Sequence, residues 1–335
     1  MPQSTLRPVE TIRTGTSEYD RFGPWIDEVR GPDDVPRLFR GHALDLDAAR
    51  LVLKVPRSIA RRDATPDMDL YDHLLVLGAE SLTVLSRTAP DRRTTPYGAG
   101  YAEQTVPLHE IAVVHDVVDL LHGRLTIRTT RGSAVTVDYN GSARAHVTRL
   151  VGALRDAASA APPSTVGALL ADAGRAAVTD GATRDLGRDD QALEADFREV
   201  AGVGARLAVW AAHGRRRLVP RGTGWDGLVH RLAHSLSPAT LQGAVLAGGA
   251  GALEVFGRRE QVTRGTTPVV SSSRLVVPLG TLTRLDVGAD PRYEGTVVVG
   301  LHTTAVTTTL VVPEDSAAAR LVAGVTGTSG VARAR

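Results

Sequence analysis

Residues 73–111 read HLLVLGAESLTVLSRTAPDRRTTPYGAGYAEQTVPLHEI, and residues 244–282 read AVLAGGAGALEVFGRREQVTRGTTPVVSSSRLVVPLGTL. A shift of 171 positions (244 − 73) superimposes the two stretches without a gap. Identical residues then coincide, among them Gly78 with Gly249, Leu82 with Leu253, Arg87 with Arg258, and Val106-Pro107-Leu108 with Val277-Pro278-Leu279. Self-similarity at a fixed spacing predicts one folding unit that is used twice.

Each copy carries the pattern of a strand-rich unit that ends in a helix. HLLVLG and SLTVLSR, separated by Ala79-Glu80, predict a hairpin, and RLTIRTT and AVTVDY predict a second one. Residues 142–155 then place apolar side chains at helical spacing. The second copy repeats this order and ends in a helix over 315–325. We expect about seven strands and one closing helix in each copy.

Composition shifts and proline positions divide the chain into five parts. The predicted parts are an extended N-terminal arm at 1–48, a first strand-rich domain at 49–158, a helical spacer at 159–212, a second strand-rich domain at 213–326 and a flexible tail at 327–335. RRRLVPR at 215–221 matches LVLKVPR at 51–57 and is the predicted first strand of the second copy. ALEADFREVAGVGARLAVW, which ends at Trp210, is a predicted spacer helix.

The repeat resembles a bacterial pleckstrin-homology-like domain of the GRAM and short-PH group. The residues that carry the resemblance are the hairpin strand Leu82–Arg87, the Val106–Ile111 strand end, Gly123–Thr129 and the helix 142–155, with their second-copy equivalents Leu253–Arg258, Val277–Leu282, Gly295–Leu301 and 315–325. The resemblance implies an α+β fold of two β-barrel or sandwich domains. It implies that a C-terminal helix closes each domain and that a helical spacer joins the two.

The composition of the chain excludes some classes of function. The chain has 335 residues, a formal net charge of +2 and no cysteine, so disulfides and cysteine nucleophiles are excluded. The near-neutral charge does not indicate nucleic-acid binding. Lys54 is the only lysine, an arginine-for-lysine bias that is typical of actinobacterial, GC-rich genomes. We see no secretory signal and no apolar run of about 18 residues, so we expect a cytoplasmic protein.

Several motifs resemble nucleotide-binding or metal-binding motifs, but they are better explained as structural features. Gly222–Gly227 reads G-x-G-x-x-G, but arginines surround the preceding strand and no acidic residue follows at about 20 positions. His230 and His234 share a helical spacing, but no glutamate base lies between them. Neither a G-x-S-x-G elbow nor a P-loop is present. We therefore expect no catalytic, cofactor or metal residues, and not an enzyme.

Two groups of residues are candidates for binding. The arm gathers aromatic and apolar side chains that either pack on the first domain as an extra strand or dock another protein, namely Tyr19, Phe22, Trp25 and Ile26. Basic side chains near early loops suit phosphate or carboxylate groups, namely Lys54, Arg57, Arg61, Arg62, Arg258 and Arg259.

The sequence thus predicts a non-enzymatic binding or scaffold protein that acts through tandem domains. The expected partner is a protein, including a second copy of this chain, through interaction or self-assembly. The alternative is peripheral binding to an anionic membrane lipid, or to another phosphate-bearing ligand, through the arginine and lysine loops.

Overall fold

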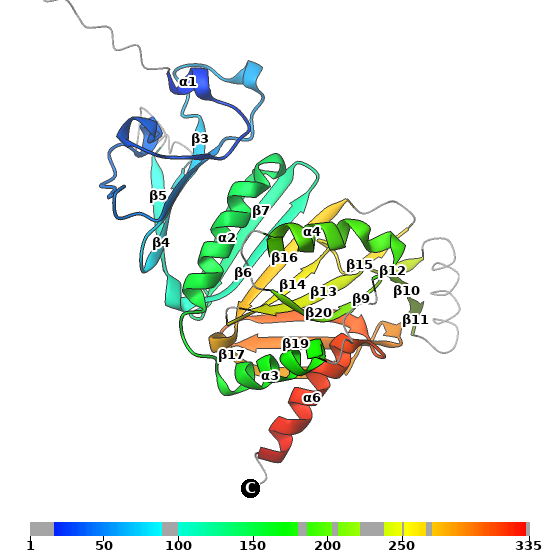
Figure 1. Cartoon of the computed structure of the whole chain (residues 1–335). Coiled ribbons are helices and arrows are strands. Elements are labelled where there is room, and N and C mark those ends of the chain that lie inside the picture. Colours follow the sequence, from blue (N-terminus) through cyan, green and yellow to red (C-terminus); the bar gives the residue numbers. More distant parts are fainter. Residues whose placement is uncertain are drawn as a thin grey trace, which may run out of the picture.

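The computed structural model describes residues 17–88, 100–179, 186–202, 207–221, 238–249, 251–265 and 270–332 (Figure 1). The protein is a mixed α+β structure made mostly of antiparallel sheets. Among the described residues no sheet closes on itself into a barrel, so that part of the predicted architecture is not present.

The first copy supplies two groups of strands and a helix. The first group is a five-stranded sheet in the order β1 (Asp27–Glu28), β2 (Leu51–Pro56), β3 (Tyr71–Leu77), β4 (Ser81–Arg87) and β5 (Tyr101–Pro107). The second group is the meander β6 (Ile111–Asp119), β7 (His122–Thr129) and β8 (Ala134–Asn140), followed by helix α2 (Arg144–Ala158).

The second copy repeats that order. Its first group is β9 (Ala208–His213), β13 (Ala244–Gly249), β14 (Ala252–Gly257) and β16 (Ser271–Pro278). Its second group is β17 (Leu282–Ala289), β19 (Thr296–Thr303) and β20 (Thr307–Pro313), followed by helix α6 (Ala317–Ala332). Short strands form two small side sheets, from β10 (Arg216–Arg217), β11 (Val219–Pro220), β12 (Ala239–Leu241), β15 (Val262–Arg264) and β18 (Tyr293–Glu294).

The hairpins of the two copies have the same register. Leu75 pairs with Val84 in the first copy, and Leu246 pairs with Val255 in the second. Both second-copy positions follow from the first by the shift of 171 that the sequence shows. The predicted hairpin at 73–87 and its repeat at 244–257 are therefore confirmed.

The two copies share one sheet. Strand β6 of the first copy pairs antiparallel with β16 of the second, with Val114 opposite Val276 and Asp116 opposite Arg274. This pairing creates a seven-stranded sheet in the order β8-β7-β6-β16-β14-β13-β9. The copies are thus joined by backbone hydrogen bonds and not only by the spacer.

A buried charge cluster reinforces the junction. Glu254 on β14 is fully buried and accepts hydrogen bonds from Arg155 of α2 at 3.1 Å and from Arg274 of β16 at 2.8 Å. Both arginines are buried as well. The closing helix of the first copy is therefore tied to the sheet of the second copy, where an uncompensated charge would be costly.

Helices cover both faces of the shared sheet (Figure 1). Helices α2 and α4 (Gln191–Gly202) lie on one face, where Phe197 packs edge-on against Phe256 at 5.3 Å between ring centroids. On the other face, Leu253 and Val255 pack against β19, β20 and α6. Helix α3 (Thr165–Thr179) lies against α6, β9 and β17 and completes this second core.

Two local expectations were wrong. Residues 208–213 form strand β9 at the edge of the shared sheet, not the end of a helix through Trp210. The first strand of the second copy is therefore β9, and 215–221 holds only the two-residue strands β10 and β11. Helix α6 ends at Ala332.

Candidate functional site

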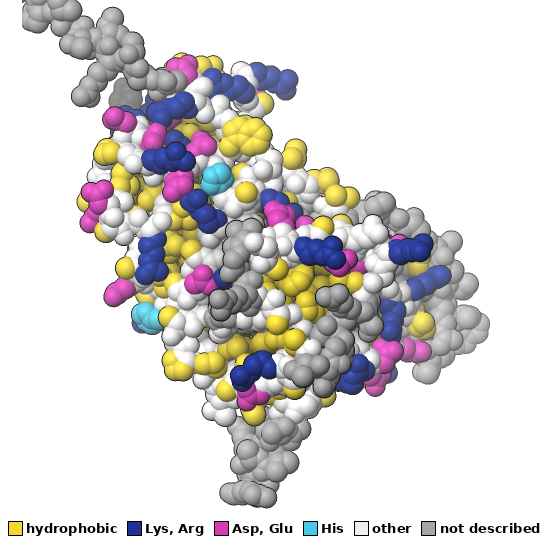
Figure 2. Space-filling view, viewed as in Figure 1, with side chains coloured by type: hydrophobic (Ala, Val, Ile, Leu, Met, Phe, Trp, Pro, Cys, Tyr) yellow, Lys and Arg dark blue, Asp and Glu magenta, His cyan; other side chains and the backbone are white. Residues whose placement is uncertain are grey.

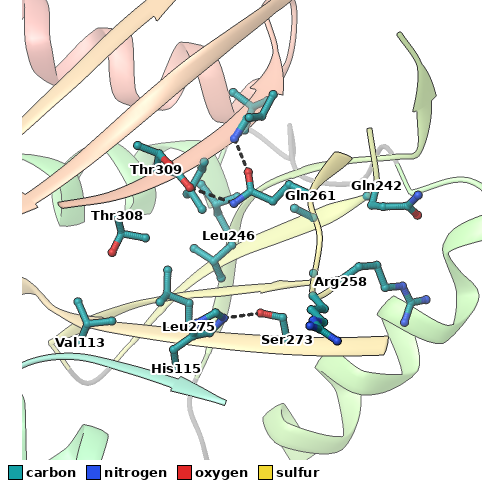
Figure 3. Close-up of a pocket in the computed structure, with 18 of the residues that line it drawn as sticks. Val113, His115, Gln242, Leu246, Arg258, Gln261, Ser273, Leu275, Thr308 and Thr309 are labelled. Carbon is teal, nitrogen blue, oxygen red and sulfur yellow. Dashed lines mark hydrogen bonds between the residues drawn. The ribbon is translucent and has the colours of Figure 1, made fainter. Parts of the chain in front are cut away.

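A cavity of about 340 Å³ lies where the two copies meet (Figure 3). Its floor is the shared sheet, with Val113 of β6, Leu246 of β13 and Leu275 of β16. Its opposite wall is β20, from which Thr308 faces the cavity and Thr309 lies nearby. The volume is within the range of small-molecule sites. A cavity of this size, lined by both apolar and polar side chains, is suited to a small ligand.

The cavity lining is positively charged at its mouth. Arg128 of β7 and the neighbouring pair Arg258 and Arg259 line it, and none of its described lining residues is an aspartate or glutamate. Arg258 donates to the carbonyl oxygen of Ser271 at 2.6 Å and lies 3.8 Å from Asp196, and Arg259 pairs with Asp119 at 2.9 Å. Within the described residues Arg128 forms no ion pair. An anionic group is the natural complement of this mouth.

His115 of β6 is a half-buried titratable group in the lining. Its Nε2 atom lies 2.8 Å from Ser273 Oγ of β16 (Figure 3), so this contact also crosses the junction. Burial, and to a lesser degree the charge of Arg128, lowers the pKa of His115. The imidazole is therefore neutral at neutral pH and adds polarity without charge.

Gln261 fixes the wall of the cavity. Its amide nitrogen donates to the carbonyl oxygen of Thr309 at 2.9 Å, and its side-chain oxygen accepts from the backbone N–H of Val311 at 2.6 Å. The Gln261 side chain thus supplies both a donor and an acceptor to backbone groups of β20, as a neighbouring strand would (Figure 3).

A second hollow, of about 790 Å³, opens on the first-copy side of the junction. Arg57 and Arg259, both predicted anion-binding residues, line it together with Arg124. Three aspartates, Asp72, Asp119 and Asp138, line it as well, so its charge is balanced. On the face in Figure 2, basic and acidic side chains are likewise interspersed. This hollow is less selective for anions than the junction cavity.

The remaining predicted anion-binding residues do not join a common site. Lys54 is buried, with Nζ 5.4 Å from the Tyr71 ring centroid and 3.4 Å from the carbonyl oxygen of Asp34. Arg61 lies over the Tyr19 ring at 4.1 Å and donates to that residue's carbonyl oxygen. Arg62 is exposed beside Asp63. Lys54 and Arg61 therefore hold the arm in place.

The predicted partner-binding residues of the arm divide into two kinds. Phe22 and Ile26 are buried in the chain's own core, and β1 pairs with β2 as an additional strand. Tyr19 is half-buried against Arg61, whereas Trp25 is 56% exposed. Of the four, only Trp25 presents most of its surface to a partner.

Other apolar side chains are exposed at the tip of the β6–β7 hairpin. Leu120 and Leu121 are 66% and 61% exposed, and Leu120 has a φ of +54°. Val270 is also exposed and precedes Ser271, which pairs with Asp119. A leucine in this left-handed conformation is strained, and exposed apolar clusters often mark contact surfaces.

Several sequence motifs cannot be placed. Gly222–Gly227, His230 and His234 lie outside the described residues. Elsewhere in the described ranges no group of three or more His, Asp or Glu side chains is arranged to hold a metal ion. No described helix combines the length and the apolar character that a membrane-crossing segment needs.

The sequence did not identify Arg128 and His115 as site residues. Each looks ordinary within its own strand, because their position at the cavity follows from the β6–β16 pairing between distant segments. Arg258 and Arg259 were identified from their local basic cluster.

Comparison with known proteins adds no relatives. No protein-family model matches the chain, and no curated protein or solved structure matches it.

Proposed function

We propose that this chain is a non-enzymatic scaffold protein that binds other proteins through two pleckstrin-homology-like units. The repeated order of four strands, three strands and a closing helix is compatible with such units. The sheet that the two copies share makes them a single platform.

The observation that best supports protein binding is an uncovered strip on β4 and β5. Glu103 and Thr105 are exposed, and Thr83 beside them is half-exposed. Their second-copy equivalents are buried where α2 and β6 cover them, namely Glu254, Arg274 and Val276. The same strip is thus covered in one copy and open in the other, and open sheet edges readily accept protein partners.

Light scattering coupled to gel filtration tests the self-assembly form of this proposal. We expect the mass to rise above the 35.4 kDa of one chain as the loading concentration increases. A constant mass of one chain over a hundredfold concentration range would reject self-assembly.

A second candidate function is binding of an anionic ligand, and the arginine-rich mouth of the junction cavity favours it. The ligand would combine an apolar body with one carboxylate, sulfonate or phosphate. The fluorescent probe 8-anilinonaphthalene-1-sulfonate has this chemistry, and N-phenyl-1-naphthylamine is its uncharged counterpart.

Arg128→Gln should weaken binding of the sulfonate probe by about tenfold, as expected for one charged hydrogen bond, and leave the uncharged probe unaffected. Arg124→Gln is the matched control, since Arg124 lies on the same strand, pairs with Asp138 and does not line the cavity. Equal loss of both probes in Arg128→Gln, or no loss of either, would reject an anion site.

A further inference from the structure

Strand β5 is the first-copy equivalent of β16, and the two differ in their neighbours. Their ranges are related by the shift of 171, which places Glu103 on Arg274 and Thr105 on Val276. Strand β16 is paired on both sides, with β14 and β6. Within the described residues β5 is paired only with β4.

The backbone of β5 presents its free hydrogen-bonding groups at alternate residues. The N–H of Thr88 donates to the carbonyl oxygen of Gly100, and the N–H of Leu108 donates to that of Glu80, both at 2.8 Å. Even-numbered residues of β5 therefore point their backbone groups toward β4. The N–H groups of Glu103 and Thr105 consequently point away from the sheet.

The same alternation holds in β16, where the outward groups are used. The N–H of Leu279 donates to the carbonyl oxygen of Gly251, which is the equivalent of the Leu108–Glu80 bond. The backbone groups of Arg274 and Val276 accordingly point toward β6, opposite Asp116 and Val114. In the second copy, the outward backbone groups of β16 thus bind strand β6, which runs antiparallel and places Asp116 opposite Arg274.

The unpaired edge of β5 is bounded at both ends of the strand. Pro107 occupies an outward position and has no N–H, so it ends the row of donors. At the other end, Tyr101 packs edge-on against Phe39 of the arm at 5.5 Å. Strand β17, the second-copy equivalent of β6, has helix α3 packed against it.

The charge of the edge indicates the chemistry of the partner. In β16 the cationic Arg274 lies opposite the anionic Asp116. In β5 the equivalent residue is the anionic Glu103, which forms no ion pair within the described residues. Glu80, at the nearby β3–β4 turn, is exposed as well. A strand that pairs here should carry arginine or lysine where β6 carries aspartate.

We propose that the β5 edge binds an extended segment of a partner protein as an additional antiparallel strand, with a basic side chain opposite Glu103. This inference rests on the proposed function and specifies its surface, orientation and register. The seven-stranded sheet of the junction is the template for the complex.

Synthetic peptides of β6 test the proposal, because β6 already fits the equivalent edge of the second copy. One peptide has residues 111–119, IAVVHDVVD, and the other is the same peptide with Asp116→Lys, each with a polyethylene glycol tail for solubility. We expect the Asp116→Lys peptide to bind the full chain at least fivefold more tightly by fluorescence anisotropy, and the difference to shrink with added salt.

Three variants of the full chain make the test specific. Glu103→Pro removes an outward N–H but no hydrogen bond to β4, so it should abolish binding of both peptides. Glu103→Gln keeps the N–H and should reduce the preference between the peptides to less than twofold. Glu103→Lys should reverse that preference. Circular dichroism confirms that each variant is folded.

Equal affinity of the two peptides, or unchanged binding to Glu103→Pro, would overturn the proposal, and so would the absence of binding by either peptide. If neither peptide binds but the chain still self-associates in light scattering, the β5 assignment fails and the scaffold function stands. If a peptide binds with the expected preference but the chain stays monomeric, the β5 assignment holds and self-assembly fails.

Discussion

Asp116 on β6 is a buried carboxyl group at the junction between the copies. It accepts a hydrogen bond from Tyr139 Oη at 2.7 Å and lies opposite Arg274. Burial raises the pKa of Asp116 to about 6, and the Tyr139 hydrogen bond and the arginine charges oppose this only in part. Ionisation of the Asp116 carboxyl group therefore costs more free energy in the folded chain than in the unfolded chain.

This raised pKa predicts a pH-dependent stability. Because the folded chain holds the Asp116 proton more tightly, the free energy of unfolding should fall as pH rises from about 4 to about 6 and beyond. Asp116→Asn removes that loss and keeps an acceptor for Tyr139. Relative to wild type, the variant should gain about 2 kcal/mol between pH 4.5 and pH 8 in urea unfolding. A difference that does not depend on pH would contradict this prediction.

Individual residues of the candidate site were only partly predictable from the sequence. Arg258 and Arg259 belong to a local basic cluster, so composition alone identified them. Phe22 and Ile26 were equally prominent as aromatic and apolar residues, but the same character that suits a docking surface also suits a core. Burial distinguishes these two roles, and burial depends on segments far away in the sequence.

Strand β9 shows how an element is determined by its packing partners. Trp210 lies between helix α3 and strand β13, where a Cβ atom added at Gly248 would fall 1.7 Å from the indole ring. A Cβ atom at Gly174 of α3 would fall 2.2 Å from the same ring. Both glycines are thus required by the close approach of Trp210.

Gly248→Ala should destabilise the chain by roughly 1 to 3 kcal/mol, because the added methyl overlaps a buried indole. The control is Gly152→Ala in helix α2, where an added Cβ has no neighbour within 4 Å. That control should stabilise the chain by about 1 kcal/mol through helix propensity. Chemical denaturation of both variants provides the comparison, and equal effects would contradict the packing account.

The sequence predicted elements well where their signals are local. The hairpin at 73–87 and its repeat have alternating apolar residues and a short turn, and both are present in the expected register. Strand β9 was missed because its alanines and valine are compatible with helix or strand, so tertiary contact determines the outcome. Its partner β13 lies about 35 residues further on.

At the scale of the whole molecule, the β6–β16 pairing was not predictable from the repeat alone. Each copy could have folded separately with its own edges, and no local pattern specifies that an edge of one copy takes a strand of the other. The pairing joins segments about 160 residues apart, and only the assembled packing, with Glu254 between two arginines, selects it.

The shared sheet predicts that the two copies unfold together. Glu254→Ala leaves Arg155 and Arg274 buried without their carboxylate and should cost about 3 to 5 kcal/mol. Arg198→Gln, which removes an exposed pair with Glu194, should change stability by less than about 0.5 kcal/mol. Calorimetry should show one transition for wild type. Two separate transitions would mean that the copies are independent domains.

Residue-resolved amide hydrogen exchange compares the two equivalent edges directly in one experiment. The account predicts slow exchange at Arg274 and Val276, whose N–H groups face β6, and fast exchange at Glu103 and Thr105, whose N–H groups face solvent. Similar protection at both pairs, or fast exchange at Arg274 and Val276, would contradict a fused sheet with one open edge.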